Sequence, residues 1–254
     1  MTAIDKGEKS RLDETLVARG LIASRSRARD AVLRGTVRVG GKVEHKPARV
    51  VDADADISID DPARRYVSRA ALKLAAALDA FDFNPSGLDA LDIGASTGGF
   101  TQVLLERGAR HVIALDVGHD QLHPSLRDDL RVTAIEGVNA RDLHADHIGG
   151  RQIGFLVSDV SFISLRLALP PALELAEPGA TGVFLVKPQF EAGRDAIGKG
   201  GILRDPSDGE RIAAELRDWL DRQPGWRSLG VIPSPIEGGD GNREFLLAGR
   251  KDRR

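Results

Sequence analysis

The stretch from 88 to 101 holds the residues whose types and spacing suggest chemistry most directly. An apolar run carries Asp92 near its end, and Gly94, Gly98 and Gly99 follow before a second apolar run begins. This order predicts a buried strand, a tight turn that a ligand can approach closely, and the N-terminus of a helix. Such corners bind nucleotide-like ligands in doubly wound sheets. A carboxylate at Asp92 suits a ligand with an ammonium group and would repel a pyrophosphate.

The spacing of these glycines differs from Gly-x-Gly-x-x-Gly, the fingerprint of dinucleotide sites. The pattern Asp-x-Gly-x-x-x-Gly-Gly instead resembles motif I of S-adenosylmethionine-dependent methyltransferases. The resemblance implies that S-adenosylmethionine is the cofactor and that the turn contacts it, through Asp92, Gly94, Ala95, Ser96, Thr97, Gly98, Gly99 and Phe100. The alternative is an ordinary strand, turn and helix without a ligand, because short glycine motifs also occur by chance.

Other polar residues stand at the ends of further predicted strands. Apolar runs cover 111–117, 131–137, 153–160, 181–187, 228–234 and 243–248, with helical stretches between most of them. This alternation predicts an α/β domain with a mainly parallel sheet and helices on both faces, in which ligands collect at the carboxyl ends of the strands. We expect Asp116 to accept from ribose hydroxyls, and the nucleoside to lie beside Val117, Asn139 and Ala140. Asp159 and Lys187 close later strands, and Glu244 opens the last one.

Residues 1–61 form a predicted small basic domain. Ser10 and Ser24 are expected to cap two short helices, and a hairpin turn at 40–41 is expected to follow. Between Lys6 and Arg49, twelve Lys or Arg stand against five Asp or Glu, an excess that the nearly balanced whole-chain charge hides. Such an excess suits the phosphate backbone of a nucleic acid.

The order of residues in this segment is more specific than its charge. Arg11-Leu-Asp-x-x-Leu, Ser24-Arg-x-x-Ala and Gly35-x-Val-x-Val-x-Gly-Lys42 resemble the S4 RNA-binding domain, an α+β fold, over nearly its full length. The resemblance implies that the two helices and the following loop grip structured RNA by its shape and phosphates. It assigns these contacts to Arg11, Arg25, Arg29 and Lys42, and Arg65 in the basic linker 62–67 is expected to join them.

Motifs along almost the whole chain resemble the TlyA family. They are the S4-like segment, Ser68-Arg-x-x-x-Lys73-Leu, the glycine turn, Ser158-Asp-x-Ser-Phe-Ile-Ser164 and Lys187-Pro-Gln-Phe-Glu191. Members of this family are known as haemolysin A and as ribosomal RNA ribose methyltransferases. Their catalytic half is similar to FtsJ-type RNA 2′-O-methyltransferases, which use a Lys-Asp-Lys-Glu tetrad. The resemblance implies a Rossmann-like methyltransferase domain over 68–254, ribosomal RNA as the substrate with cytidine as the target, and a tetrad of Lys73, Asp159, Lys187 and Glu244.

The residue types of the tetrad fit methyl transfer to a ribose hydroxyl, which must lose its proton as it attacks. A lysine can take this proton only in its neutral form, which burial and a neighbouring cation favour. We expect Lys187 to be the base, Asp159 and Glu244 to orient it, and Lys73 to hold the ribose or a phosphate. Two other hypotheses remain: a non-catalytic RNA-binding or ribosome-assembly factor that keeps the fold, and a membrane-active haemolysin.

The amino-acid composition excludes several kinds of site and limits the expected cellular location. The chain has no cysteine, which excludes disulfides and cysteine zinc sites and is compatible with the cytoplasm. No apolar run is long enough to span a bilayer, and the N-terminus does not read as a signal peptide. We therefore expect a cytoplasmic protein whose partners are ribosomal RNA or ribosomal subunits, without membrane association.

Two further motifs resemble binding sites, but we expect neither to bind a ligand. His119 and His123 lie four residues apart but lack a third ligand, so solvated or capping histidines are expected and no metal site. The stretch 193–199 matches most of a phosphate-binding loop, yet Gly200 replaces the Ser or Thr that would hold magnesium. We expect a flexible loop over the site there.

Overall fold

The computed structural model describes residues 9–239 and 241–252. The chain divides into two compact units, residues 1–65 and 66–254. The division falls inside the linker expected at 62–67. Each unit has a hydrophobic core of its own, and the units are described separately below.

The first unit packs two helices against short antiparallel strands. The helices are α1 (Leu12–Ala18) and α2 (Arg25–Leu33), and the strands are β1 (Lys9–Arg11), β2 (Val37–Val39), β3 (Lys42–Val43), β4 (Val50–Asp52) and β5 (Ile57–Ile59). Strand β1 pairs with β4, and the order of the second sheet is β3-β2-β5. Apolar residues spaced along both helices, Leu12, Leu16, Ala28, Ala31 and Val32, form the core with Val37 and Val51.

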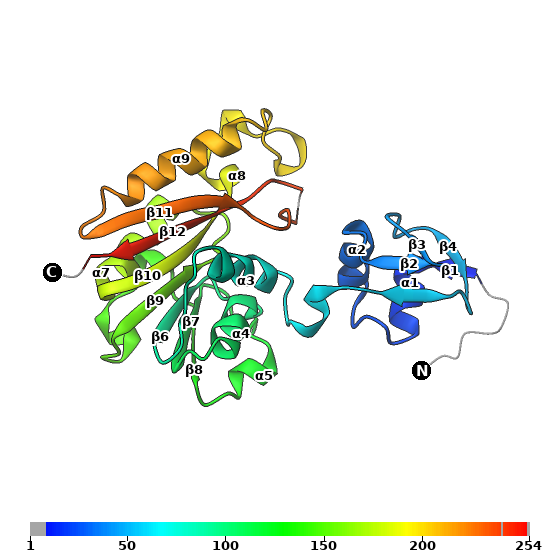
Figure 1. Ribbon diagram of the computed structural model, residues 1–254, viewed down its shortest axis with the longest axis horizontal. Coiled ribbons are helices and arrows are strands. Elements are labelled where there is room, and N and C mark those ends of the chain that lie inside the picture. The colour runs from blue at the N-terminus through cyan, green and yellow to red at the C-terminus, as the bar shows by residue number, and fades with distance from the viewer. Residues whose placement is uncertain (1–8, 240, 253–254) are drawn as a thin grey trace. The chain divides into compact units, whose positions relative to one another are not determined.

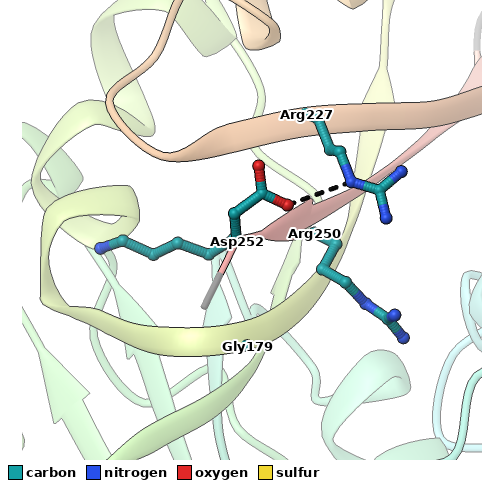
Figure 2. Close-up of a pocket in the computed structure, with 5 residues that line it drawn as sticks. Gly179, Arg227, Arg250 and Asp252 are labelled. Atoms are coloured by element: carbon teal, nitrogen blue, oxygen red, sulfur yellow. Dashed lines mark hydrogen bonds and ion pairs between the residues drawn. The ribbon is translucent and has the colours of Figure 1, made fainter. Parts of the chain in front are cut away.

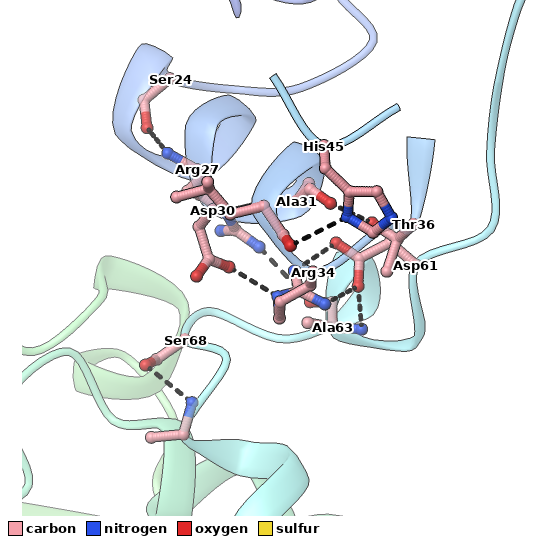
Figure 3. A network of polar contacts seen from close by, with 12 residues as sticks. Ser24, Arg27, Asp30, Ala31, Arg34, Thr36, His45, Asp61, Ala63 and Ser68 are labelled. Atoms are coloured by element: carbon pink, nitrogen blue, oxygen red, sulfur yellow. Dashed lines mark hydrogen bonds and ion pairs between the residues drawn. The ribbon is translucent and has the colours of Figure 1, made fainter. Parts of the chain in front are cut away.

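One of the two expected helix caps is present in this unit. Ser24 accepts a hydrogen bond from the backbone N–H of Arg27 at 3.4 Å and caps α2 (Figure 3). The expectation for Ser10 is wrong, because Ser10 lies within β1 and its hydroxyl bonds that of Thr15 at 2.6 Å. Pairing with β4 keeps the backbone extended as far as Arg11, so the helix begins one residue later than a Ser10 cap would allow.

A polar network ties α2 to the segment that leaves the first unit. Arg34 donates to both carboxylate oxygens of Asp61 at 2.8 Å and to Asp30 at 2.8 Å (Figure 3). Asp61 also accepts from the N–H of Ala63 at 2.9 Å, in the 3₁₀ turn η1 (Pro62–Arg65). Charge-assisted bidentate bonds of this kind fix geometry as well as adding energy.

The second unit is built on a twisted seven-stranded sheet among its described residues (Figure 1). Its strands are β6 (Asp89–Ile93), β7 (His111–Asp116), β8 (Val132–Glu136), β9 (Ile153–Ser158), β10 (Ala176–Val186), β11 (Trp226–Pro233) and β12 (Phe245–Lys251). Their order is β11-β12-β10-β9-β6-β7-β8. Strands β6 to β10 run parallel, whereas β12 is antiparallel to β10 and β11 to β12. The expected mainly parallel sheet is confirmed.

Helices cover both faces of this sheet (Figure 1). They are α3 (Ala71–Ala80), α4 (Gly99–Glu106), α5 (Pro124–Arg127), α6 (Leu165–Ala168), α7 (Pro170–Leu175), α8 (Pro188–Glu191) and α9 (Asp208–Leu220), with the 3₁₀ turns η2 (Ala140–Asp142), η3 (Ala145–Ile148), η4 (Arg194–Ala196) and η5 (Lys199–Gly201). Alternate residues of the strands point to opposite faces. Thus Leu91 packs with α7 and α9, and Ala90 packs with α3 and α4.

Parallel strands bring their carboxyl ends to one edge of the sheet. The residues that follow β6, β7, β9 and β10 therefore lie along this edge, and β12 begins there because it is antiparallel to β10. Of the helices in the described ranges, none is long and apolar enough to cross a membrane.

Candidate active site

The four residues of the expected tetrad form two ion pairs. Lys187 Nζ lies 2.6 Å from Asp159 Oδ1 and donates to Ser161 Oγ at 2.8 Å. Lys73 Nζ donates to Glu244 Oε2 at 2.5 Å. The Lys73–Glu244 pair is the more deeply buried, with 6% and 2% of the side chains exposed against 12% and 17% for Lys187 and Asp159. Burial of two lysines in this way requires both carboxylates.

Strand register explains how distant residues meet here. Val186 of β10 pairs with Phe245 of β12, so Lys187 and Glu244 occupy the next positions on two adjacent antiparallel strands. Asp159 follows β9, the other neighbour of β10, and its N–H donates to the carbonyl of Ile93 at 3.0 Å. Lys73 comes from α3, which packs against β12.

A serine precedes α3, but the regular helix begins only three residues after it. Helix α3 starts at Ala71, and the hydroxyl of Ser68 accepts from the N–H of Ala70 at 3.3 Å. Turn hydrogen bonds from the N–H groups of Ala71 and Leu72 precede the regular helix. This late start leaves Lys73 in the first turn of α3.

Asp92 is fully buried at the carboxyl end of β6. Its Oδ2 accepts from the hydroxyl of Thr101 at 2.7 Å, whereas its Oδ1 is buried without a hydrogen-bond partner among the described residues. Burial raises the pKa of Asp92 to about 7, and the nearby Asp159 carboxylate adds to the effect. A buried carboxylate oxygen without a donor is costly unless a ligand supplies one.

Packing within the protein explains the three glycines of the turn. A side chain at Gly94 would place its Cβ 2.8 Å from the carbonyl oxygen of Asp159, and one at Gly98 would collide with Leu126. At Gly99 the Cβ would lie 3.0 Å from that of Ser68, so this residue allows α4 to approach the segment before α3. Gly94 and Gly98 also have φ of +81° and +97°, which favours glycine.

The side chain of Phe100, the residue after the glycine turn, is buried. It is 2% exposed and packs in the core between the sheet, α3 and α4. The predicted contact between Phe100 and the cofactor therefore stays a prediction, and burial of the side chain leaves it mainly to the backbone. The amphipathic pattern of α4 turns this position inward, toward the sheet.

Asp116 organises the end of β7. Its Oδ2 accepts from the N–H of Ser96 and its Oδ1 from the N–H of Gly118, both at 2.8 Å. The first bond joins Asp116 to the glycine turn, at the level of Ala95 and Thr97. Nearby, the N–H of Val138 donates to the carbonyl of Asp116, which brings the expected adenine-side residues Asn139 and Ala140 to the same place. Val117 is 65% exposed beside them.

Two phenylalanines beside Lys187 were missed in the sequence. Phe162 is 91% exposed and has a φ of +64°, which is rare for a bulky residue. Its ring centroid lies 5.0 Å from that of Phe190, and Lys187 Nζ lies 6.0 Å from the centroid of Phe190. Both residues belong to motifs quoted above, but the exposure of Phe162 depends on a backbone angle that the sequence pattern does not reveal.

The expected RNA-binding residues lie on the surface of the first unit. Arg29, Lys42 and Arg65 are exposed. Arg11 and Arg25 both bond the fully buried carboxylate of Asp13, at 3.0 and 3.2 Å. The guanidinium of Arg11 holds the pKa of Asp13 below its usual value. Asp13, which the sequence reasoning overlooked, therefore positions two of the five residues.

The structure also shows the histidine pair and the 193–199 stretch, the two motifs that resemble binding sites. The His123 side chain accepts from the N–H of Ser125 and caps α5, and no cluster of metal-binding side chains occurs in the parts of the chain that are described. The 193–199 stretch forms 3₁₀ turns rather than a phosphate-binding loop and helix. Asn242 fastens the following residues by accepting from the N–H of Leu203 and donating to the carbonyl of Gly201.

Two protein families match the two units. The FtsJ-like methyltransferase family matches residues 66–251, and the S4 domain matches residues 10–57. The family expectation derived from the sequence is thereby confirmed.

Named relatives are similar over nearly the whole chain. The 16S/23S rRNA (cytidine-2′-O)-methyltransferase TlyA of Mycobacterium tuberculosis is 46% identical over 241 residues, which cover 94% of this chain and 89% of the relative. Hemolysin A of Brachyspira hyodysenteriae is 42% identical over 239 residues, 93% of this chain and 98% of the relative. A solved structure from Streptococcus thermophilus that carries a hemolysin name is 39% identical, with a TM-score of 0.74 over 98% of this chain and 90% of that one.

Proposed function

The chain belongs to the FtsJ-like methyltransferase family, and from this premise we propose that it methylates the ribose 2′-hydroxyl of a cytidine in ribosomal RNA. The observation that carries this proposal is the pair Lys187–Asp159 at the carboxyl edge of the sheet, together with the buried pair of Lys73 on α3 and Glu244 just before β12. Two lysines and two carboxylates beside a nucleoside-type turn suit proton removal from a hydroxyl. The name of the M. tuberculosis relative supports both the ribose and the cytidine.

The residues around the glycine turn fit S-adenosylmethionine. The unpartnered Oδ1 of Asp92 is suited to a donor such as an ammonium group. Asp116 can accept from ribose hydroxyls with the lone pairs that Ser96 and Gly118 leave unused. Val117, Asn139 and Ala140 would lie around the adenine. The bound cofactor would supply an electrophilic methyl group on a sulfonium.

Lys187 is the proposed base. In its neutral form it takes the proton of the attacking hydroxyl, and Asp159 at 2.6 Å stabilises the resulting ammonium. Ser161, whose hydroxyl accepts from Nζ at 2.8 Å, fixes its direction. Lys73, which is paired with Glu244, positions the ribose or a phosphate. Alignment of the hydroxyl with the methyl group contributes much of the remaining rate enhancement.

Two surfaces support RNA as the substrate. The first unit carries the exposed or partly exposed Arg11, Arg25, Arg29 and Lys42, which suit phosphate contacts. In the second unit, Phe162 is exposed beside Phe190, whose ring lies near Lys187, and an exposed aromatic ring is a platform on which an unstacked base can stack. Ribosomal subunits in the cytoplasm are the proposed setting.

Methyl transfer from labelled S-adenosylmethionine to ribosomal subunits, followed by mapping of the modified nucleotide, tests this function. We expect label on the 2′-oxygen of a cytidine ribose. Label on a base would contradict the role of the tetrad.

The two other hypotheses have their own measurements. If the protein is a methyltransferase, Lys187→Ala should abolish methyl transfer and leave RNA binding intact. If it is a non-catalytic assembly factor, the wild type itself should transfer no methyl group, and Lys187→Ala should bind RNA as the wild type does. A membrane-active haemolysin, the activity that the name of the B. hyodysenteriae relative describes, would release dye from liposomes as purified protein.

A further inference from the structure

A cavity lies at the edge of the sheet opposite the tetrad. It has a volume of about 290 Å³ and is lined by Gly179, Arg227, Arg250, Lys251 and Asp252 (Figure 2). Gly179 lies near the start of β10, whereas Lys187 directly follows the end of this strand. At about 3.3 Å per residue, the cavity is roughly 25 Å from Lys187. The proposed methyl transfer leaves these residues without a role.

Two arginines of the cavity face each other across antiparallel strands. Arg227 of β11 is paired in register with Arg250 of β12. Like charges in directly opposite positions destabilise a sheet. Arg227 Nε binds Asp252 Oδ1 at 3.1 Å, and its terminal nitrogens point away from Asp252 (Figure 2). Within the described ranges, the side chain of Arg250 makes no hydrogen bond or ion pair.

Lys251 adds positive charge to the cavity but is already engaged. Its Nζ donates to the carbonyl groups of Leu173, Glu174 and Ala176 at 2.9, 3.0 and 2.8 Å. These bonds satisfy carbonyls at the C-terminal end of α7, so Lys251 has a structural role that needs no ligand. The structure of the sheet edge does not account for the apposition of the two arginines.

We propose that Arg227 and Arg250 bind a phosphate of the RNA backbone and anchor the substrate at a point remote from the tetrad. Guanidinium groups bind phosphate oxygens through paired hydrogen bonds, and a phosphate between the two would offset their repulsion. The proposal rests on the proposed function, because that function makes RNA the partner. Ribosomal RNA is long enough to contact both edges of the sheet at once.

A matched pair of variants tests this anchor in the full-length chain. Arg250→Gln removes the unpaired guanidinium, and Arg131→Gln is the control. Arg131 is also half exposed, is bound to Asp129, and precedes β8 at the other end of the sheet. The affinity for ribosomal RNA is measured at several salt concentrations. Arg250→Gln should bind several-fold more weakly at low salt and lower the slope of log K against log salt by about one.

The control variant should match the wild type in affinity and slope. At saturating RNA, Arg250→Gln should transfer methyl groups at the wild-type rate, because only anchoring is lost. Without RNA it should unfold at the wild-type temperature or above, since a like-charge contact has been removed. A lower unfolding temperature together with slower transfer would assign Arg250 to the fold and overturn the proposal.

Two further results would also overturn it. If Arg250→Gln and Arg131→Gln have the same RNA affinity and the same salt slope, RNA does not bind in the cavity. If inorganic phosphate stabilises the wild type but not Arg250→Gln, and the two proteins bind RNA equally, the cavity binds a free phosphate-bearing ligand instead. Methyl transfer by the wild type is read separately, so failure of the proposed function is distinguished from failure of the anchor.

Discussion

Replacing Asp92 by asparagine should stabilise the cofactor-free protein at pH 8 and weaken its hold on S-adenosylmethionine. Asp92 is fully buried, and burial raises its pKa from 3.8 to about 7. Between these two pH values the unfolded chain is ionised at this position, whereas the folded chain retains the proton. The folded state therefore binds more protons, and the wild type loses stability as pH rises from about 4 to about 7.

The size of this loss follows from the two pKa values. Their difference corresponds to about 4 kcal/mol. For a unit of this size, each kcal/mol shifts the melting temperature by roughly 2–4 °C, so the largest expected effect is roughly 8–16 °C. Asparagine does not titrate, and its carboxamide oxygen can still accept from Thr101, so the variant lacks this loss.

Thermal unfolding of both proteins between pH 5 and pH 8.5 measures the effect. Other titrating groups cancel in the comparison; His111, whose pKa burial lowers, is common to both proteins. The variant's advantage should grow as pH rises to about 7 and then stay constant. Calorimetry at pH 8 should show S-adenosylmethionine binding weakened by roughly 1.5–3 kcal/mol, the scale of charged hydrogen bonds.

Parallel pH profiles for the wild type and Asp92→Asn would refute the reasoning, because Asp92 would then titrate alike in the folded and unfolded chains. Unchanged cofactor affinity would remove Asp92 from the binding site even if the pH profiles differed.

Four further outcomes are expected. Lys187→Arg should be nearly as inactive as Lys187→Ala in single-turnover transfer, because arginine keeps its proton, whereas Lys73→Arg should retain more activity. Asp116→Ala should weaken cofactor binding by roughly 1.5–3 kcal/mol in calorimetry. Arg34→Ala should lower the free energy of unfolding of the first unit by about 3 kcal/mol in urea, because it leaves Asp61 unpaired. Deletion of residues 1–61 should spare cofactor binding but reduce RNA affinity and its salt dependence.

Each of these has a contrary result. If Lys187→Arg stays active while Lys73→Arg does not, the two lysines exchange roles. Unchanged cofactor affinity in Asp116→Ala removes Asp116 from the site. Unchanged urea unfolding of Arg34→Ala means that solvent satisfies Asp61, and full RNA affinity of the deleted chain assigns the first unit another role.

Local patterns in the sequence determined much of this protein. The apolar runs predicted the strands of the second unit, because burial on both faces of a parallel sheet requires nearly continuous apolar residues. Motif spacing indicated both families, which the matches over residues 10–57 and 66–251 confirm. The helix after the glycine turn and the Ser24 cap were also readable, since they depend on neighbouring residues only.

Contacts between distant residues were decided only by the tertiary structure. Lys73 and Glu244 are 171 positions apart, and they pair because α3 packs on β12. Strand pairing kept Ser10 extended against the local signal for a cap. The orphaned oxygen of Asp92 and the Arg227–Arg250 apposition likewise depend on burial and register. Such features arise when elements pack together. The residues next to a position in the sequence do not determine which residues will lie opposite it in the sheet.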